Sequence, residues 1–150
     1  MTNARRKGAS GEGEFAAAVL DVLGAHLARQ LDQHRTDGLD LAPEPVSASD
    51  VAMLLRRYAI ECKRPRSAPP AEVVGWWHQT VRQATDAGLH PLLAYRADRI
   101  PWRIVLPLEL LVPDATGFST AHDGSTAPHA ATLTLAGFAA FAACTWPARS

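Results

Sequence analysis

Apolar residues recur at helical spacing near the start of the chain, so one face of a helix is expected to be buried there. The residues on this face are Phe15, Val19, Val22, Leu23 and Leu27. Because Ser10 is well suited to cap the first turn, the pattern predicts a helix over residues 10–29. Residues 1–9 have no such apolar face and contain adjacent arginines and a lysine, so we expect a basic flexible arm.

Strand-like and helical patterns alternate further along the chain. Short apolar runs are predicted to be strands, and a longer amphipathic segment with Pro at its start and Gly after its end is predicted to be a helix. The strands are expected over residues 58–63, 90–96 and 102–107, this helix over 70–87, and a closing helix over 132–144. The order predicts a mixed α/β domain, which we divide into the arm (1–9), a core (10–107) and a C-terminal extension with the closing helix (108–150).

The predicted strand over residues 58–63 ends with an acid and a base close together. Successive side chains of a strand point to opposite faces, so Glu61 and Lys63 share one face while Ile60 and Cys62 share the other. An acid and a base at the end of an otherwise apolar strand are not typical of a solvated surface. We therefore treat Glu61 and Lys63 as candidate catalytic residues.

Two more acids lie in apolar surroundings. Glu12 falls on the apolar face of the first predicted helix, whereas Glu14 falls on the opposite, solvent side, and Asp40 is flanked by two leucines. Carboxylates that converge in a partly buried place repel one another unless a cation lies between them. Oxygen ligands without a His or Cys pattern select a hard ion such as Mg²⁺ or Mn²⁺, which can orient a phosphodiester and activate a water molecule.

Composition narrows the class of protein. The 15 Lys and Arg residues balance 15 Asp and Glu residues, so there is no global positive field, and any nucleic acid must be bound by local basic clusters. The two cysteines, Cys62 and Cys144, form no CxxC pair, which favours a reducing compartment and argues against a zinc ribbon. Neither a signal peptide nor a stretch long enough to span a bilayer is evident, so we expect a soluble intracellular protein.

Together these residues resemble the motifs of the PD-(D/E)XK nuclease superfamily, and specifically the archaeal-type Holliday junction resolvases and their phage-encoded relatives. The resemblance covers about residues 5–107 and consists of the segment RKGASGEGE (6–14), Asp40, and the ExK motif formed by Glu61 and Lys63. It implies a restriction-endonuclease-like core, in which a central mixed sheet is flanked by helices.

The resemblance also implies roles for individual residues. Glu12, Asp40 and Glu61 are expected to bind the metal, and Lys63 is expected to be the fourth catalytic residue. The segment between Asp40 and Glu61 is longer than the short hairpin common in the family, so Asp37 is a substitute candidate for Asp40.

Other residues are expected to support DNA binding or the site. The basic residues expected to contact DNA are Arg6, Lys7 and Arg64. Nucleases of this superfamily often carry a Gln or Lys that reaches the site from the helix after ExK. Gln79 and Gln83 are the candidates for this accessory role.

The function that the resemblance implies is a Mg²⁺-dependent endodeoxyribonuclease, with Mn²⁺ able to substitute, that resolves Holliday junctions by paired symmetric nicks. Two symmetric nicks need two identical sites, so we expect a homodimer acting in the cytoplasm of a bacterial host that carries the phage or prophage. Two alternatives stay open. One is the same chemistry on another DNA, as in nicking, repair or restriction, and the other is a nuclease-fold protein that binds DNA or a partner protein without cutting.

Overall fold

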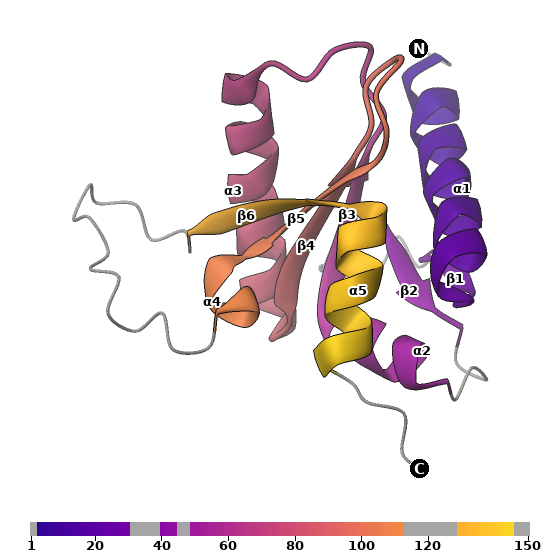
Figure 1. The fold of residues 1–150 in the computed structure, drawn as a ribbon. Coiled ribbons are helices and arrows are strands. Elements are labelled where there is room, and N and C mark those ends of the chain that lie inside the picture. The colour runs from indigo at the N-terminus through magenta and orange to yellow at the C-terminus, as the bar shows by residue number, and fades with distance from the viewer. Residues whose placement is uncertain (1–2, 31–39, 45–48, 113–128, 146–150) are drawn as a thin grey trace.

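In the part of the chain that the structure describes, a six-stranded mixed sheet forms the centre, with its strands in the spatial order β1-β2-β3-β4-β5-β6 (Figure 1). The structure is a computed structural model that describes residues 3–30, 40–44, 49–112 and 129–145, with the backbone alone for residues 3–9. The strands are β1 (Leu27–Arg29), β2 (Leu41–Pro43), β3 (Tyr58–Lys63), β4 (His90–Tyr95), β5 (Arg103–Pro107) and β6 (Ala130–Thr134). The helices are α1 (Asn3–Leu23), α2 (Asp50–Leu55), α3 (Pro70–Ala87), α4 (Leu108–Leu111) and α5 (Leu135–Thr145). The predicted fold class, an α/β domain with a mixed sheet flanked by helices, is confirmed.

The two central strands, β3 and β4, are parallel, and this determines at which edge of the sheet they end. β3 and β4 run in the same direction, with Lys63 opposite Tyr95, while the other neighbouring strands pair antiparallel. A parallel pair needs a crossover connection, and α3 supplies it. Both strands therefore end at the same edge of the sheet, where the Arg96 N–H donates a hydrogen bond to the Lys63 carbonyl at 3.1 Å.

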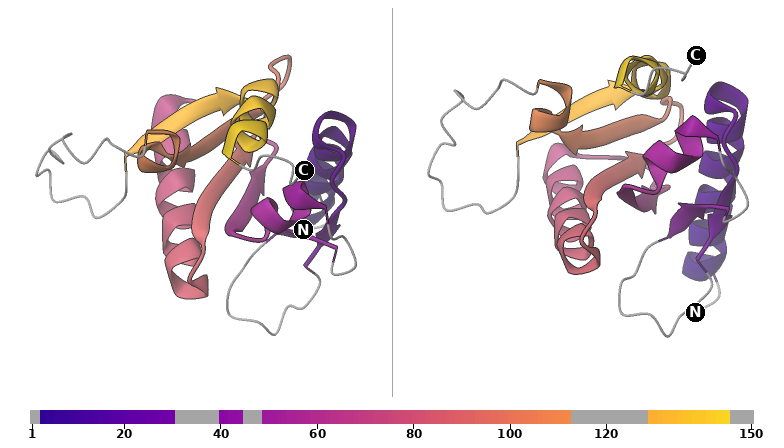
Figure 2. Two further views of the ribbon diagram at one scale, coloured as in Figure 1. Left: turned by 60° about the horizontal axis from the view of Figure 1, so that its bottom comes forward. Right: turned by 90° about the horizontal axis from the view of Figure 1, so that it is seen from below.

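Helices cover both faces of the sheet (Figures 1 and 2). On one face α1, α2 and α5 pack on the strands through a large apolar cluster that includes Phe15 and Phe138. On the other face α3 packs through a smaller cluster that includes Trp77. Because side chains alternate along β3, Ile60 faces the large cluster and Glu61 faces α3.

Helix α1 begins earlier than predicted. It begins at Asn3 rather than at Ser10, so residues 3–9 are helical where the sequence predicts a flexible arm. Ala, Arg and Lys are good helix formers, and a helix that already exists can be extended through them without an apolar face. The absence of apolar positions was therefore a poor guide to where the helix begins.

Helix α1 also ends earlier than predicted, at Leu23 rather than near residue 29. Gly24 has a φ of +67°, in the left-handed region that ends helices and that glycine adopts without strain. The chain then turns into β1, so Leu27, predicted to lie on the helix face, is instead a buried residue of an edge strand.

The elements around the candidate site are confirmed. The strands predicted over residues 58–63, 90–96 and 102–107 are β3, β4 and β5, and the helix predicted over 70–87 is α3.

None of the helices within the described ranges has the length and apolar character that crossing a membrane would need.

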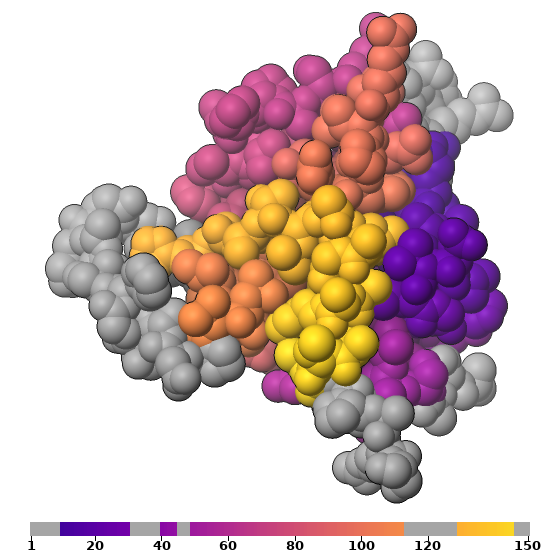
Figure 3. Space-filling model, viewed as in Figure 1, coloured from indigo at the N-terminus to yellow at the C-terminus, as the bar shows by residue number. Residues whose placement is uncertain are grey.

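The segment after β5 completes the sheet and one helical layer. The predicted closing helix is confirmed as α5, but residues 132–134 belong to β6, which pairs antiparallel with β5. Helix α5 lies against α1 on the molecular surface (Figure 3), and its Phe138 is buried in the large cluster. Residues after Pro107 therefore contribute to the same core as the strands before them.

Helix α1 approaches the end of β3 so closely at Gly11 that a side chain has no room. A Cβ on Gly11 would lie 2.6 Å from the Arg64 Cβ, whereas a Cβ on Gly13 would meet nothing within 4 Å. We expect Gly11→Ala to lower the free energy of unfolding by about 1–3 kcal/mol, because α1 must move away. The matched control, Gly13→Ala, should raise it by about 0.5–1 kcal/mol, because Ala is the better helix former. Urea unfolding measures both, and a stabilising Gly11→Ala would contradict the close approach.

Candidate active site

The end of β3 brings together the acid and the base that the sequence singled out. Glu61 is only 5% exposed, and its Oε1 lies 2.6 Å from the Lys63 Nζ. The same oxygen accepts a hydrogen bond from Nε2 of Gln79 on α3, at 3.4 Å. Glu61 and Lys63 therefore share the face of β3 that α3 covers, and Gln79 of α3 holds the Glu61 carboxylate through a hydrogen bond.

Asp40 lies directly before β2, and both its backbone and its side chain hold it beside β3. Its N–H donates to the Ile60 carbonyl at 3.2 Å, which continues the antiparallel pairing of Leu41 with Ile60. Its Oδ2 accepts a hydrogen bond from the Cys62 N–H at 2.9 Å. Strand pairing thus places the Asp40 carboxylate at the peptide group that joins Glu61 to Cys62.

The Asp40 carboxyl lacks compensating positive charge. Burial raises its pKa and the Glu61 carboxylate raises it further, to about 6, although the Cys62 N–H and the charges of Lys63 and Arg29 oppose the rise. Burial and the same group of carboxylates also raise the pKa of the Cys62 thiol, which is therefore held neutral. Two carboxylates are thus crowded next to a single ammonium group.

Glu12 comes close enough to Asp40 for the two carboxylates to repel, but its side chain is bound elsewhere. It forms an ion pair with Arg29 on β1. Burial raises the pKa of Glu12, the hydrogen bond from Arg29 opposes the rise, and the Asp40 charge adds to it. The structure therefore brings Asp40, Glu61 and Lys63 together and leaves Glu12 at their margin.

The donor set fits a hard divalent ion such as Mg²⁺. Across the residues that the structure describes, no three or more His, Cys, Asp or Glu side chains are grouped so that they could hold a metal ion. Mg²⁺ does not need such a group, because it usually keeps several waters and is bound through one or two carboxylates plus substrate phosphates. Asp40 and Glu61 are such a pair of oxygen donors, and burial together with the neighbouring Glu61 carboxylate raises the pKa of Asp40, a rise that a bound cation would oppose.

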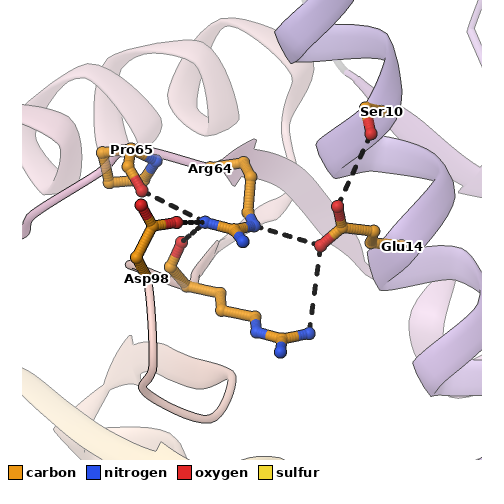
Figure 4. Close-up of polar contacts among 6 residues, drawn as sticks. Ser10, Glu14, Arg64, Pro65 and Asp98 are labelled. Atoms are coloured by element: carbon orange, nitrogen blue, oxygen red, sulfur yellow. Dashed lines mark hydrogen bonds and ion pairs between the residues drawn. The ribbon is translucent and has the colours of Figure 1, made fainter.

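A second group of charged side chains surrounds Arg64, the residue after Lys63 (Figure 4). Its guanidinium binds Glu14 of α1 at 3.0 Å and Asp98, in the turn between β4 and β5, at 2.8 Å. The Glu14 side chain is 38% exposed, against 13% for Glu12, so Glu14 is the more solvated of the two acids as predicted, but its ion pair with Arg64 was not predicted. The predicted helical periodicity of α1 is correct. The side of α1 that carries Gly11 and Glu14 lies against Arg64 at the end of β3, and a periodic pattern cannot show such a contact.

The remaining predicted residues occupy the following places. Arg6 and Lys7 belong to the first turns of α1, and their side chains lie outside the described part of the structure. Asp37 also lies outside the described residues. Gln83 is half-buried on α3, one turn after Gln79.

Sequence reasoning missed two partners of the site, Arg29 and Asp98. Arg29 binds Glu12 across 17 positions of sequence, and Asp98 binds Arg64 across 34. An arginine at a strand end and an aspartate in a turn are common on protein surfaces, so neither residue carried a local signal. Each pairing depends on how the strands are arranged.

The charge crowding at Asp40 predicts how stability depends on pH in the presence of EDTA. The pKa of Asp40 is near 4 in the unfolded chain and about 6 in the folded protein. Because the folded state holds the proton more tightly, the free energy of unfolding falls as pH rises from about 4 through about 6. Asn can still accept the Cys62 N–H but has no charge. We therefore expect Asp40→Asn to leave stability unchanged near pH 4 and to raise it by up to about 3 kcal/mol at pH 8.

Denaturant unfolding at both pH values measures this effect. Asp21→Asn is the control, because Asp21 is an exposed acid on α1, and its effect should stay within about 0.5 kcal/mol at either pH. A loss of stability in Asp40→Asn at pH 8 would show that the Asp40 charge is satisfied in the folded protein.

The comparisons with known proteins agree with this geometry. The model of the family described as "Phage putative PDDEXK endonuclease" matches residues 3–122, which is most of the chain. Searches of curated proteins and of solved structures found no match. The matched region includes α1, Asp40 and the whole of β3, and the resemblance to phage-encoded PD-(D/E)XK nucleases is confirmed. The chain therefore belongs to this family of phage PD-(D/E)XK endonucleases.

Proposed function

We propose that the chain is a Mg²⁺-dependent DNA endonuclease, with Mn²⁺ able to replace Mg²⁺, and that Asp40 and Glu61 hold the ion. The observation that carries this proposal is the meeting of Asp40, Glu61 and Lys63 at the end of β3, through the Cys62 N–H and the Lys63 ion pair. Glu12 is a third ligand in this proposal, which requires its carboxylate to leave Arg29.

The side chains divide the work of phosphodiester hydrolysis among them. A divalent ion held by the two acids supplies Lewis-acid activation of the phosphate and lowers the pKa of a bound water. Lys63, whose side chain is 27% exposed, presents an ammonium group that stabilises negative charge developing on the phosphate oxygens. Gln79 is the accessory residue, because its amide fixes one oxygen of Glu61.

The proposed substrate is a DNA four-way junction, cut by paired symmetric nicks. The order of the motifs over residues 5–107, which resembles that of junction resolvases, supports this choice. A homodimer supplies the two identical sites that symmetric nicks require, and Arg6 and Lys7 are the proposed DNA contacts. The place of action is the cytoplasm of a bacterial host that carries the phage or prophage.

Cleavage of a labelled four-way junction, beside duplex and single-stranded DNA, tests the proposal directly. With Mg²⁺ or Mn²⁺ we expect paired symmetric nicks in the junction, and with EDTA none. Glu61→Ala should lower the cleavage rate by about 100-fold or more, because it removes a metal ligand and the partner of Lys63. The control, Glu72→Ala, removes an exposed acid of α3 and should cut like the wild type.

The other outcomes separate the alternatives. Metal-dependent cutting of all three DNAs at similar rates would assign a general nuclease and reject junction resolution. Binding of DNA without cutting under any metal would reject the catalytic proposal.

Gln79 offers a finer test of the site. Gln79→Ala frees one oxygen of Glu61 from its hydrogen bond, so we expect the cleavage rate to fall about 10-fold. Gln83→Ala, one turn later on α3, should have a smaller effect. Single-turnover rates with saturating enzyme in excess over DNA measure both variants, and a larger loss for Gln83→Ala would transfer the accessory role to that residue.

A further inference from the structure

The Arg64 side chain joins its own segment to two others, α1 and the turn between β4 and β5 (Figure 4). Its Nε donates to Glu14 of α1 at 3.0 Å, and its Nη1 lies 2.8 Å from the Asp98 carboxylate. The same Nη1 lies 3.2 Å and 3.4 Å from the carbonyls of Pro65 and Arg96. One guanidinium thereby joins α1, the segment after β3 and the turn between β4 and β5.

The backbone of α1 lies against the same residue. A Cβ on Gly11 would lie 2.6 Å from the Arg64 Cβ, so glycine permits the approach. Gly11 and Glu14 are three residues apart and thus on the same side of the helix. Glu12 lies in the same turn of α1, so the contacts that hold this turn also decide how far Glu12 stands from Asp40 and Glu61.

The Arg64 guanidinium is committed to partners within the protein. Two carboxylates neutralise it, and its hydrogen bonds with them raise its pKa further. A DNA phosphate that bound Nε or Nη1 would displace Glu14 or Asp98 and leave an acid next to the phosphate. Beside it lies a cavity of about 320 Å³, lined by Ser10, Glu14, Arg64, Pro65, Arg66 and Asp98.

We propose that Arg64 is a positioning residue: it clamps α1, and with it Glu12, onto the end of β3 beside Lys63. This role replaces the DNA contact expected from the sequence, and it rests on the proposed function. Arginine is required because its planar fork can bind acids on two segments at once, whereas a lysine ammonium is a point charge that cannot hold the same geometry.

Steady-state kinetics on the DNA that the wild type cuts best test the clamp. Arg64→Gln and Arg64→Lys should both lower kcat about 10-fold or more and raise the Mg²⁺ concentration for half-maximal rate about 10-fold, with KM for DNA changed less than about twofold. Glu14→Gln should show the same pattern, and Arg64→Gln/Glu14→Gln should be no worse than Arg64→Gln alone. Arg66→Gln removes an equal charge from the same segment without breaking the clamp, and should leave kcat unchanged.

A phosphate contact would behave differently. Arg64→Lys would then cut like the wild type, and Arg64→Gln would raise KM and reduce the salt dependence of DNA binding by about one phosphate. That result would overturn the proposal.

Hydrogen exchange separates failure of the clamp from failure of the proposed function. Amides of residues 10–23 in α1 should exchange about 10-fold faster in Arg64→Gln than in the wild type, and at the wild-type rate in Arg66→Gln. If the wild type cuts no DNA but α1 loses protection in Arg64→Gln, the nuclease proposal fails and the clamp stands. Unchanged protection of α1 in Arg64→Gln rejects the clamp whether or not the protein cuts DNA.

Discussion

The candidate site depends on β3 being covered on both faces. Tyr58 and Ile60 are buried against α1 and α5, so the alternate residue, Glu61, must face α3 although it is charged. A buried carboxylate needs partners, and Lys63 and Gln79 are within reach because one follows on the same face of β3 and the other lies on the covering helix. The pairing of β2 with β3 then adds Asp40 at the Cys62 N–H. Packing thus holds two carboxylates closer together than their charges alone would allow.

Ion pairs with neighbouring acids explain how a protein with no net charge can contain several basic residues near the candidate site. Arg29 is paired with Glu12, Lys63 with Glu61, and Arg64 with an acid on each of two segments. Asp40 is held by a backbone N–H, and its pKa rises because that bond only partly offsets burial and the neighbouring Glu61. Among these acids, Asp40 is the one held by a backbone N–H rather than by an ion pair, so a cation would be stabilised most beside Asp40 and the neighbouring Glu61.

The sequence was sufficient for the parts of the fold and site that depend on local periodicity. The two-residue period of β3 placed Glu61 and Lys63 on one face, and the apolar spacing of α1 placed Glu12 toward the sheet. The start of α1 could not be predicted, because polar helix formers carry no periodic signal. The partners of Glu12 and Arg64 could not be predicted either, since they follow from the antiparallel position of β1 and from the turn after β4.

The same ion pairs affect which basic residues can bind a DNA phosphate without losing an interaction within the protein. A phosphate that bound the Nε of Arg29, or the Nε or Nη1 of Arg64, would displace a carboxylate, so part of the attraction would be offset by a broken ion pair. For Arg29 this exchange would free the Glu12 carboxylate, which is the step that the proposed role of Glu12 as a third ligand requires, and a cation between Glu12 and Asp40 would offset their repulsion. For Arg64 it would loosen α1 from β3 and move Glu12 away from the site. The two arginines are thus paired with acids of the same helix, Arg29 with Glu12 from β1 and Arg64 with Glu14 from the end of β3.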